Sequence, residues 1–445
     1  MSAATSSPDV AIVGLGRVGL PLALSFADRG LTVLGIDNDA ERLQAVAAGR
    51  MPFQETGTDE LIARVHGSAR LSTSERVADA AQADAIVLTL GTPSFSHIEI
   101  DMRDIRSALD DLLPHLRPGH VIVLRSTVAP GTTDFVAGYL ERQRGLRAGV
   151  DVHVAHVPER IATGKFLDEI DTLPCIVGAV GGEASGEHVA RVFGCFDAPV
   201  VQTTPVQAEL AKIWANILRY THFALPNLLM MDCEQYDANV FEVIDLINRD
   251  YPRGGIAQPG FTAGTCLRKD FTFSEERSNA PGMLLAVSRV NESVPHFLVQ
   301  GMKRRSPDGT LNGRKVAVLG LAFKGDTDDE RDSLAHKLVR LLERELADVA
   351  VHDPVVASPT QPLEVALHEA QVVVVAANHA AFAPSETRVA IGTLSVPDCL
   401  VVDPWNHLGS GQVFAFAEEL IPLSVEVRSG RGEAPAGGGG GAGSL

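Results

Sequence analysis

The sequence predicts an α/β protein with two doubly wound domains that are joined by a long central helix. Three observations predict this class. Apolar, strand-like segments alternate with amphipathic, helix-like segments in the first half of the chain, the alternation stops near Thr203, and it resumes at Lys315. Strands that alternate with helices indicate parallel sheets, because each parallel connection needs a crossover. The 445 residues also exceed a single core, since domains usually hold about 100–200 residues.

The first half supplies one domain, predicted over residues 1–202. Its strand candidates are short and apolar: Val10–Val13, Leu31–Ile36, Ala85–Leu90, His120–Arg125 and Val152–His156. Helices are expected between these strands, for example over Pro21–Arg29 and Ile105–Leu113. Cys175 lies in a further apolar, strand-like segment.

The middle of the chain, residues 203–303, predicts helices and contains no convincing strand. Residues from Pro205 to about Gln235 have apolar side chains at helical spacing, and Pro226 is expected to kink this long helix. Further helices are predicted over Val240–Asn248 and Met283–Lys303.

A second, smaller α/β domain is predicted over residues 304–428. Its strand candidates are Lys315–Gly320, Asp348–His352, Val372–Ala376 and Leu400–Val402. The Gly- and Ala-rich tail, residues 429–445, is predicted to be disordered.

Composition excludes several classes of function. A net charge of −18 argues against general nucleic-acid binding, which needs a basic face. No apolar run reaches the roughly 18 residues of a membrane span, and the first residues do not resemble a secretory signal. The five scattered cysteines form neither metal-type pairs nor a disulfide framework, so we expect no metal and a cytoplasmic protein with reduced thiols.

The motif Gly14-Leu15-Gly16-Arg17-Val18-Gly19 follows a predicted strand and opens a helix. Gly14 permits a tight turn, Gly16 lets a pyrophosphate approach the backbone, and Gly19 allows close helix packing. The free N–H groups of the helix start then face the phosphates. Asp37 ends the second strand 18 positions after Gly19, where a carboxylate binds ribose hydroxyls and repels the extra phosphate of NADP. The motif therefore predicts NAD.

Other residues around this turn are expected to contact the cofactor. Val18 lies within the motif, and Arg42 follows Asp37 by five positions. Thr92 and Thr127 lie in small, hydroxyl-rich turns after two further strands, at the sheet edge where parallel sheets bind ligands. Such turns are also ordinary loops.

Cys266 is the candidate nucleophile. It follows a run of small residues from Gly260, which lets a substrate come close, and the flanking Lys269 and a helix start are expected to lower the pKa of its thiol. Most cysteines are instead small buried hydrophobes, as expected of Cys175 and Cys399.

Three further polar residues are candidates for a catalytic role. Lys212 and Asn216 lie four positions apart on the long helix, so they share one face and together can hold an oxyanion. A solvated polar face is the other interpretation. Glu159 follows a strand and can act as a general base if it is buried.

Taken together, these segments resemble the nucleotide-sugar 6-dehydrogenases of the UDP-glucose and GDP-mannose dehydrogenase family. The resemblance runs from about Val10 to Asn406 in the family's order. It implies two Rossmann-like doubly wound domains, a helical dimerisation region, NAD as cofactor and a nucleotide-sugar substrate. It also implies a homodimer through the central helix, and oxidation of a C6 alcohol to a carboxylate with two NAD molecules.

The resemblance implies roles for individual residues. Cys266 matches the nucleophile, and the residues that match its assistants are Lys212, Asn216, Glu159, Asp270 and Thr127. Arg331 is expected near the cofactor and the thiol, and Arg253 resembles an arginine that reaches the substrate of the partner subunit. The implied substrate-binding residues are Glu159, Arg160, Lys212, Asn216, Arg253, Gly260, Phe323 and Lys324.

The implied chemistry is sequential. Cys266 attacks the aldehyde left by the first oxidation, and the second oxidation of the thiohemiacetal leaves a thioester. Glu159 or Asp270 activates the water that hydrolyses it, while Lys212 and Asn216 stabilise each oxyanion.

Two departures from the family pattern affect the expected substrate pocket. Ala263-Gly264 stands where the family usually has Gly-Gly, and Asn227-Leu228 where it usually has Asn-Glu. The Pro158–Gly164 segment looks like members that act on UDP-N-acetylmannosamine, whereas Cys266–Asp270 leans toward the UDP-glucose and GDP-mannose pattern. We rank UDP-N-acetylmannosamine first and UDP-glucose second.

Two other interpretations stay open. The β-hydroxyacid dehydrogenases also join a Rossmann domain to a helical domain, but they lack the thiol nucleophile and the second Rossmann-like domain. A catalytically weak homologue that only binds NAD or a nucleotide sugar is the alternative without an enzymatic role.

Overall fold

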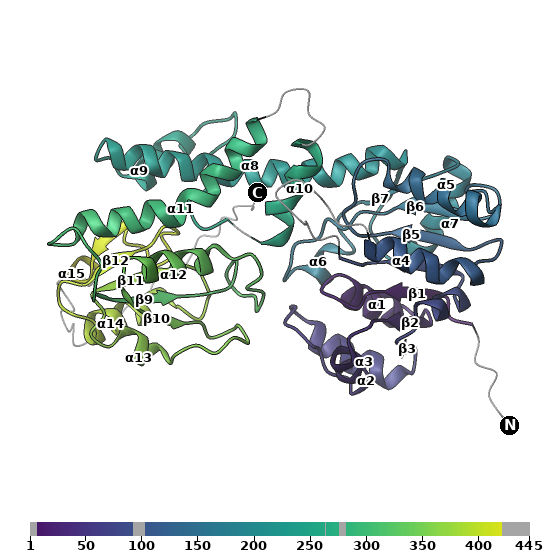
Figure 1. Cartoon of the computed structure of the whole chain (residues 1–445), viewed down its shortest axis with the longest axis horizontal. Helices are drawn as coiled ribbons and strands as arrows, with labels where there is room; N and C mark the ends of the chain where they lie inside the picture. Colours follow the sequence, from purple (N-terminus) through teal and green to yellow (C-terminus); the bar gives the residue numbers. More distant parts are fainter. Residues whose placement is uncertain (1–6, 92–102, 263, 276–281, 421–445) are drawn as a thin grey trace, which may run out of the picture.

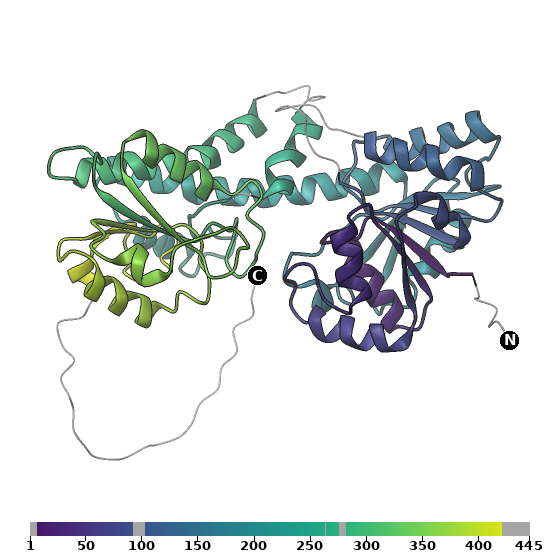
Figure 2. The same cartoon turned by 60° about the horizontal axis from the view of Figure 1, so that its bottom comes forward.

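The computed structural model describes residues 7–91, 103–262, 264–275 and 282–420. Two lobes, each built on one sheet, lie at opposite ends of an elongated molecule, and the helix α8 (Pro205–Gln235) runs between them (Figure 1). Turned by 60°, the lobes lie side by side below the central helices (Figure 2). The predicted roles of Thr92 and Ala263 and the predicted disorder of residues 429–445 lie outside the described residues.

The N-terminal lobe contains an eight-stranded sheet in the order β3-β2-β1-β4-β5-β6-β7-β8. Its strands are β1 Val10–Val13, β2 Val33–Ile36, β3 Leu71–Ser74, β4 Ala85–Leu88, β5 Val121–Leu124, β6 His153–His156, β7 Cys175–Ala179 and β8 Val200–Thr203. The first six follow the strand order of a dinucleotide-binding sheet, and all neighbours are parallel except β6 and β7. The five predicted strands and the strand-like segment at Cys175 are confirmed.

Helices cover both faces of this sheet. They are α1 Gly19–Asp28, α2 Ala40–Ala47, α3 Thr58–Ser68, α4 Arg103–Leu112, α5 Thr132–Arg144, α6 Phe166–Glu169 and α7 Glu183–Phe193. Along β1, Val10 and Ile12 belong to one buried cluster and Ala11 and Val13 to the other, as the alternation of side chains along a strand requires. The lobe therefore has two cores, one on each face.

The middle of the chain is helical, as predicted. It contains α8, α9 (Val240–Asn248), α10 (Thr265–Glu275) and α11 (Met283–Arg305). A capping box between Thr204 and Gln207 begins α8, and the helix continues through Pro226. The helix start expected beside Cys266 is the beginning of α10, whose extent was not predicted from the sequence.

The C-terminal lobe is a smaller doubly wound sheet in the order β10-β9-β11-β12-β13, with only β13 antiparallel to its neighbour. Its strands are β9 Lys315–Leu319, β10 Asp348–His352, β11 Val372–Val375, β12 Leu400–Val402 and β13 Phe414–Phe416. Its helices are α12 Leu334–Arg344, α13 Leu363–Leu367, α14 Pro384–Leu394 and α15 Ala417–Leu420. The predicted second α/β domain is confirmed, with β13 as an additional edge strand.

The carboxyl ends of the two sheets face each other. Asp328, in the loop after β9, accepts an ion pair from Arg17 Nη1 at 2.7 Å and a hydrogen bond from the Gln54 backbone N–H at 3.0 Å. From the same loop, Lys324 Nζ donates to the Thr163 carbonyl at 2.6 Å. Open α/β sheets bind ligands beyond the carboxyl ends of their strands, so both sheets direct ligands to one region between the lobes. Across the described helices, none combines the length and the apolarity needed to cross a membrane.

Candidate active site

The turn after β1 has the geometry that a dinucleotide needs. Gly14 has a φ of +98°, and a Cβ at Gly19 would lie 1.8 Å from the Gly14 carbonyl oxygen, so neither position accepts a side chain. A Cβ at Gly16, by contrast, would meet no atom within 4 Å. The space over Gly16 and the free N–H groups at the start of α1 therefore fit the pyrophosphate of NAD.

Asp37 lies at the end of β2 and joins this turn to the next helix. Its Oδ2 accepts a hydrogen bond from the Leu15 N–H at 2.6 Å and an ion pair from Arg42 Nη1 at 2.9 Å. Its Oδ1 accepts from the Asp39 N–H at 3.0 Å. The predicted neighbours Asp37 and Arg42 are thus brought together beside the glycine turn, where a ribose would lie.

Two other predicted cofactor residues lie at the same edge. Val18 occupies the N-cap position of α1, and Thr127 follows β5 in the next loop along the sheet. Their contact with the cofactor stays a prediction.

The candidate catalytic residues come together where α10 crosses α8. Cys266 lies in the first turn of α10 and Asp270 one turn later, while Lys212 and Asn216 lie one turn apart on α8. Asn216 Nδ2 donates to Asp270 Oδ2 at 2.6 Å, which ties the two helices together. Asp270 Oδ1 is buried and has no hydrogen-bond partner within the described structure. One carboxylate oxygen is therefore available to a proton.

The surroundings of Cys266 make its thiol less acidic than expected. The side chain is reachable by solvent, yet protein surrounds it on most sides, and this burial is the main cause that raises the pKa of the thiol. Asp270 raises this pKa further, whereas Lys212, Lys269 and Arg331 lower it. The expectation of a lowered thiol pKa is wrong, because burial and the adjacent carboxylate outweigh the cations.

Asp270 experiences the same competition. Burial raises the pKa of its carboxyl group, and Lys269, Lys212 and the hydrogen bond from Asn216 lower it. A carboxylate with a raised pKa takes up a proton more readily near neutral pH. Asp270 is therefore suited to accept the proton of the thiol or of a water.

Glu159 is buried, but a cation occupies its carboxylate. Arg125 Nη2 donates to Glu159 Oε2 at 2.7 Å, and the Ile161 N–H donates to Oε1 at 2.8 Å. Arg125 lies at the end of β5 and packs over the Phe193 ring. Donors occupy both oxygens of the Glu159 carboxylate, so this geometry favours a positioning role for Glu159.

Predicted substrate residues surround the opening from the C-terminal side. Phe323 packs against Gly264 so closely that a Cβ at Gly264 would lie 2.9 Å from the Phe323 ring. A Cβ at Gly260 would likewise lie 2.4 Å from the Trp405 ring. Burial lowers the pKa of Lys324, which reaches across to Thr163. The glycine-rich segment before Cys266 is therefore shaped by aromatic rings of the C-terminal lobe.

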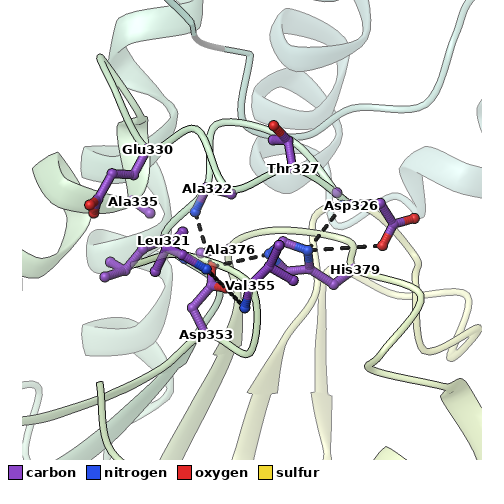
Figure 3. A network of polar contacts seen from close by, with 12 residues as sticks. Leu321, Ala322, Asp326, Thr327, Glu330, Ala335, Asp353, Val355, Ala376 and His379 are labelled. Carbon is purple, nitrogen blue, oxygen red and sulfur yellow. Dashed lines mark hydrogen bonds and ion pairs between the residues drawn. The ribbon is translucent and has the colours of Figure 1, made fainter. Parts of the chain in front are cut away.

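A buried polar network holds the loop that carries these residues (Figure 3). Asp353 Oδ2 accepts from the Leu321 N–H at 2.6 Å and the Ala322 N–H at 3.1 Å, and it lies 3.1 Å from His379 Nε2. The Asp326 N–H donates to His379 Nδ1 at 3.0 Å. Both ends of the loop are fixed, so Phe323 and Lys324 between them have defined positions.

Arg331 and Arg17 connect this loop to the dinucleotide turn. Arg331 donates to both oxygens of Asp329, at 2.8 and 2.7 Å. Arg17, from the glycine motif, lies 3.4 Å from the same carboxylate. Arg331 is close enough to Cys266 to lower the pKa of the Cys266 thiol. Arg331 thus lies between Asp329 and Cys266, and its expected contact with the cofactor stays a prediction.

Two predicted substrate residues point elsewhere within this chain. Arg253 lies at the surface, with its guanidinium over the Tyr251 ring at 4.9 Å. Arg160 Nη2 donates to the Pro174 carbonyl at 2.6 Å. The described contacts of a single chain do not bring either one to Cys266.

Cys175, Cys399 and the Asn227-Leu228 departure differ in burial. Cys399 is buried, as expected, and Cys175 is half-buried. Asn227 is buried and bridges Asn291 and the Gly260 N–H, each at 2.9 Å, whereas Leu228 is exposed. In the described part of the chain, no three potential ligands cluster to hold a metal ion.

Three residues were missed by sequence reasoning: Arg17, Arg125 and His379. Arg17 and Arg125 each adjoin a motif that was analysed, but their partners lie far away in sequence. His379 lies after β11 without a recognisable motif, so only the fold places it beside Asp353.

Comparisons with known proteins agree with this geometry. Residues 8–197, 206–293 and 317–410 match the NAD binding, central and UDP binding domains of the UDP-glucose/GDP-mannose dehydrogenase family. A UDP-N-acetyl-D-mannosamine dehydrogenase of Pyrococcus horikoshii is 32% identical over 84% of this chain and 90% of its own length. An NDP-N-acetyl-D-galactosaminuronic acid dehydrogenase of Ralstonia nicotianae is 30% identical over 86% and 95%. The solved structure of UDP-D-ManNAc dehydrogenase from Pyrococcus horikoshii superposes with a TM-score of 0.83 at 30% identity, over 89% of this chain and 95% of that one.

Proposed function

The chain belongs to the UDP-glucose/GDP-mannose dehydrogenase family, and from this premise we propose that it oxidises the C6 alcohol of UDP-N-acetylmannosamine to a carboxylate. The broader activity, NAD-dependent dehydrogenation of a nucleotide sugar, follows from family membership. The observation that carries the proposed oxidation to a carboxylate is the group formed by Cys266, Asp270, Asn216 and Lys212 at the crossing of α8 and α10.

Cys266 gives this group a covalent intermediate. NAD, when bound, accepts the hydride in each of the two oxidations. Between them, the thiolate of Cys266 adds to the aldehyde carbon, forming a C–S bond, and the resulting oxyanion takes up a proton. Loss of a hydride and a proton from this thiohemiacetal leaves a thioester. The bond to Cys266 retains the aldehyde while the cofactor is exchanged.

Lys212 and Asn216 support the charge that develops at this carbon. Lys212 supplies a positive charge, and Asn216 lies one turn further along the same face of α8. Preorganised donors of this kind stabilise a tetrahedral oxyanion more than its planar precursor. The proposed role of both residues is therefore in each tetrahedral stage.

Asp270, rather than Glu159, is the proposed base for hydrolysis. Asp270 has a buried oxygen without a partner and lies one helical turn from Cys266. Glu159 has both oxygens occupied, by Arg125 and by a backbone N–H. Water that attacks the thioester gives its proton to Asp270, the C–S bond breaks, and the thiolate of Cys266 returns.

The substrate assignment rests on the relatives and on one segment of sequence. Relatives that act, by name, on UDP-N-acetyl-D-mannosamine align over most of this chain. The Pro158–Gly164 segment, whose Thr163 carbonyl contacts Lys324, also resembles theirs. UDP-glucose is the second candidate, because the residues from Cys266 to Asp270 follow the other pattern.

The test is NADH production from a panel of UDP-N-acetylmannosamine, UDP-N-acetylglucosamine, UDP-glucose and GDP-mannose. We expect the highest kcat/KM with the first and two NADH per sugar oxidised. One NADH per sugar would contradict the thioester and favour a simple alcohol dehydrogenase. No NADH from any of the four would support a homologue that only binds its ligands.

We also propose that the active unit is a homodimer that pairs through α8. One face of this helix carries exposed apolar side chains at helical spacing: Leu210, Trp214, Leu218, Leu225 and Leu228. Trp214 is 51% exposed and Leu218 is 55% exposed in the single chain. An apolar stripe of this size is typical of a protein interface, and a second copy would cover it. In such a dimer, the exposed Arg253 of one subunit would reach the substrate site of the partner subunit, as the family resemblance implies.

A further inference from the structure

A hollow of about 330 Å³ lies at the junction of α10, α11 and α12, and its lining is mostly cationic. The residues around it are Arg268, Glu292, Lys337, Arg340, Leu341 and Arg344. Four of these six side chains are positively charged, in a chain whose net charge is −18. The hollow therefore concentrates positive charge on an otherwise acidic protein.

The wall of the hollow is held by internal ion pairs. Glu292 accepts from Arg268 Nε at 2.5 Å and from Lys337 Nζ at 3.1 Å, and Lys337 also donates to the Glu292 carbonyl at 2.7 Å. Arg268 Nη1 donates to the Asp332 carbonyl at 3.1 Å. Arg268 Nη1 also lies 3.4 Å from Asp332 Oδ1. Glu292, the carboxylate among the described residues of the lining, is thus already neutralised, and the three helices are fixed relative to one another.

The other two arginines have no such partners. Arg340 and Arg344 lie one turn apart on the exposed face of α12, and neither forms an ion pair or hydrogen bond with a described residue. Two unpaired guanidinium groups over a prebuilt basic wall are suited to a multiply charged anion, because each guanidinium can donate two parallel hydrogen bonds to phosphate oxygens.

We propose that this hollow is a second anion site, which binds pyrophosphate or the diphosphate of a nucleotide through Arg340, Arg344, Lys337 and Arg268. The site is distinct from the active site, because Arg268 extends toward α11 and α12 whereas Asp270, on the same helix, faces Asn216 of α8. Among the described residues, the lining contains no aromatic ring to stack on a base. The site therefore recognises the phosphates and not the nucleoside.

The inference is independent of the substrate and of the covalent mechanism. It is tested by equilibrium dialysis of the full chain against labelled pyrophosphate, which counts the anions bound per chain. The double variant Arg340→Glu/Arg344→Glu should lose one bound pyrophosphate per chain, while the sites at the dinucleotide turn and the C-terminal lobe keep theirs. Arg340→Lys, which keeps the charge, should bind within several-fold of the unmodified protein.

Arg142→Glu is the matched control. Arg142 and Arg344 are both exposed and both lie in the last turn of their helices, so their reversal has the same effect on net charge and on the helix end. The affinity of Arg142→Glu for pyrophosphate should stay within about twofold of that of the unmodified protein. Arg344→Glu alone should weaken pyrophosphate binding at the second anion site about tenfold or more. Equal losses in Arg142→Glu and Arg344→Glu, or an unchanged count in the double variant, would overturn the proposal.

The ligand class is tested by competition for the second anion site, measured as displacement of the labelled pyrophosphate whose binding requires Arg340. ADP and UDP should displace it no better than unlabelled pyrophosphate does, and adenosine should not displace it. Displacement by ADP or UDP about tenfold better than by pyrophosphate would show that the base is read, and would overturn the assignment to phosphate alone.

Discussion

The substitution Asp270→Asn isolates the hydrolytic step of the proposed reaction. The asparagine side chain has almost the same volume, and its amide can still pair with Asn216, whose Nδ2 lies 2.6 Å from the present carboxylate. The substitution removes the one oxygen that is free to take a proton. General bases contribute about 10²–10⁴ in rate, so we expect kcat to fall by that factor.

The two oxidations should survive this change. The Asp270 carboxylate raises the pKa of Cys266, so its removal lowers that pKa and increases the fraction of thiolate. The thiohemiacetal and the thioester therefore still form, and only hydrolysis slows. Stopped-flow absorbance should show a burst approaching two NADH per active site, followed by slow turnover.

Two results would refute this reasoning. A steady-state rate within about threefold of the unmodified enzyme would exclude Asp270 as the base, because a general base is worth far more than that. A complete absence of the burst, in a variant with an unchanged melting temperature, would mean that Asp270 acts before the first hydride leaves. Mass spectrometry of the stalled enzyme should also find the substrate acyl group on Cys266.

Three other predictions concern stability, assembly and pH. Glu159→Gln leaves the buried Arg125 without its charged partner and should destabilise the N-terminal lobe by about 3–5 kcal/mol, measured by denaturant unfolding. Replacing both residues by methionine should recover most of this loss, and an unchanged free energy of unfolding in Glu159→Gln would refute the contribution of the ion pair. Trp214→Glu should convert the proposed dimer to monomers in light scattering, whereas Val389→Glu, on the exposed surface of α14, should not; equal masses would refute the α8 interface. Burial lowers the pKa of His156 to about 3, so below pH 6.5 the unfolded chain binds a proton there while the folded chain does not. The free energy of unfolding should therefore decrease as the pH is lowered, by about 2 kcal/mol at pH 5. In His156→Gln, denaturant unfolding should show a smaller decrease, and an identical dependence on pH would contradict the burial effect.

Local patterns were sufficient for much of the fold. The strands β1, β4 and β5 are uninterrupted apolar runs because they are buried on both faces, and such runs are visible in sequence. The two strands that were missed in the N-terminal lobe, β3 and β8, lie at the edges of its sheet and are half polar. Edge strands lack one buried neighbour, so their composition resembles that of loops.

In the candidate site, too, the local features could be predicted from the sequence and the long-range pairs could not. The glycine turn is a local structure of a few residues, and its geometry agrees with the roles predicted for Gly14, Gly16 and Gly19. The pairing of Glu159 with Arg125 could not be predicted, because the two residues are 34 positions apart and meet only through the parallel pairing of β5 and β6. That pairing changes the proposed chemistry, since it turns a candidate base into an arginine-bound carboxylate.

The two lobes share a fold, and the differences between their corresponding turns explain why they bind different ligands. Asp37 and Asp353 occupy equivalent positions, each at the end of the second strand and each accepting from the backbone after the first.

Both carboxylates are buried, but Asp37 is paired with the partly exposed Arg42, whereas Asp353 lies beside the fully buried His379. Although burial raises the pKa of Asp353, the hydrogen bonds from His379 and from backbone N–H groups lower it by more, so it remains an anion in the interior. Ala322 occupies the place that Gly16 leaves open for a pyrophosphate. The C-terminal lobe has thus lost the dinucleotide contacts and uses its carboxylate to fix the loop of Phe323 and Lys324, which leaves NAD to the first lobe and the nucleotide sugar to the second.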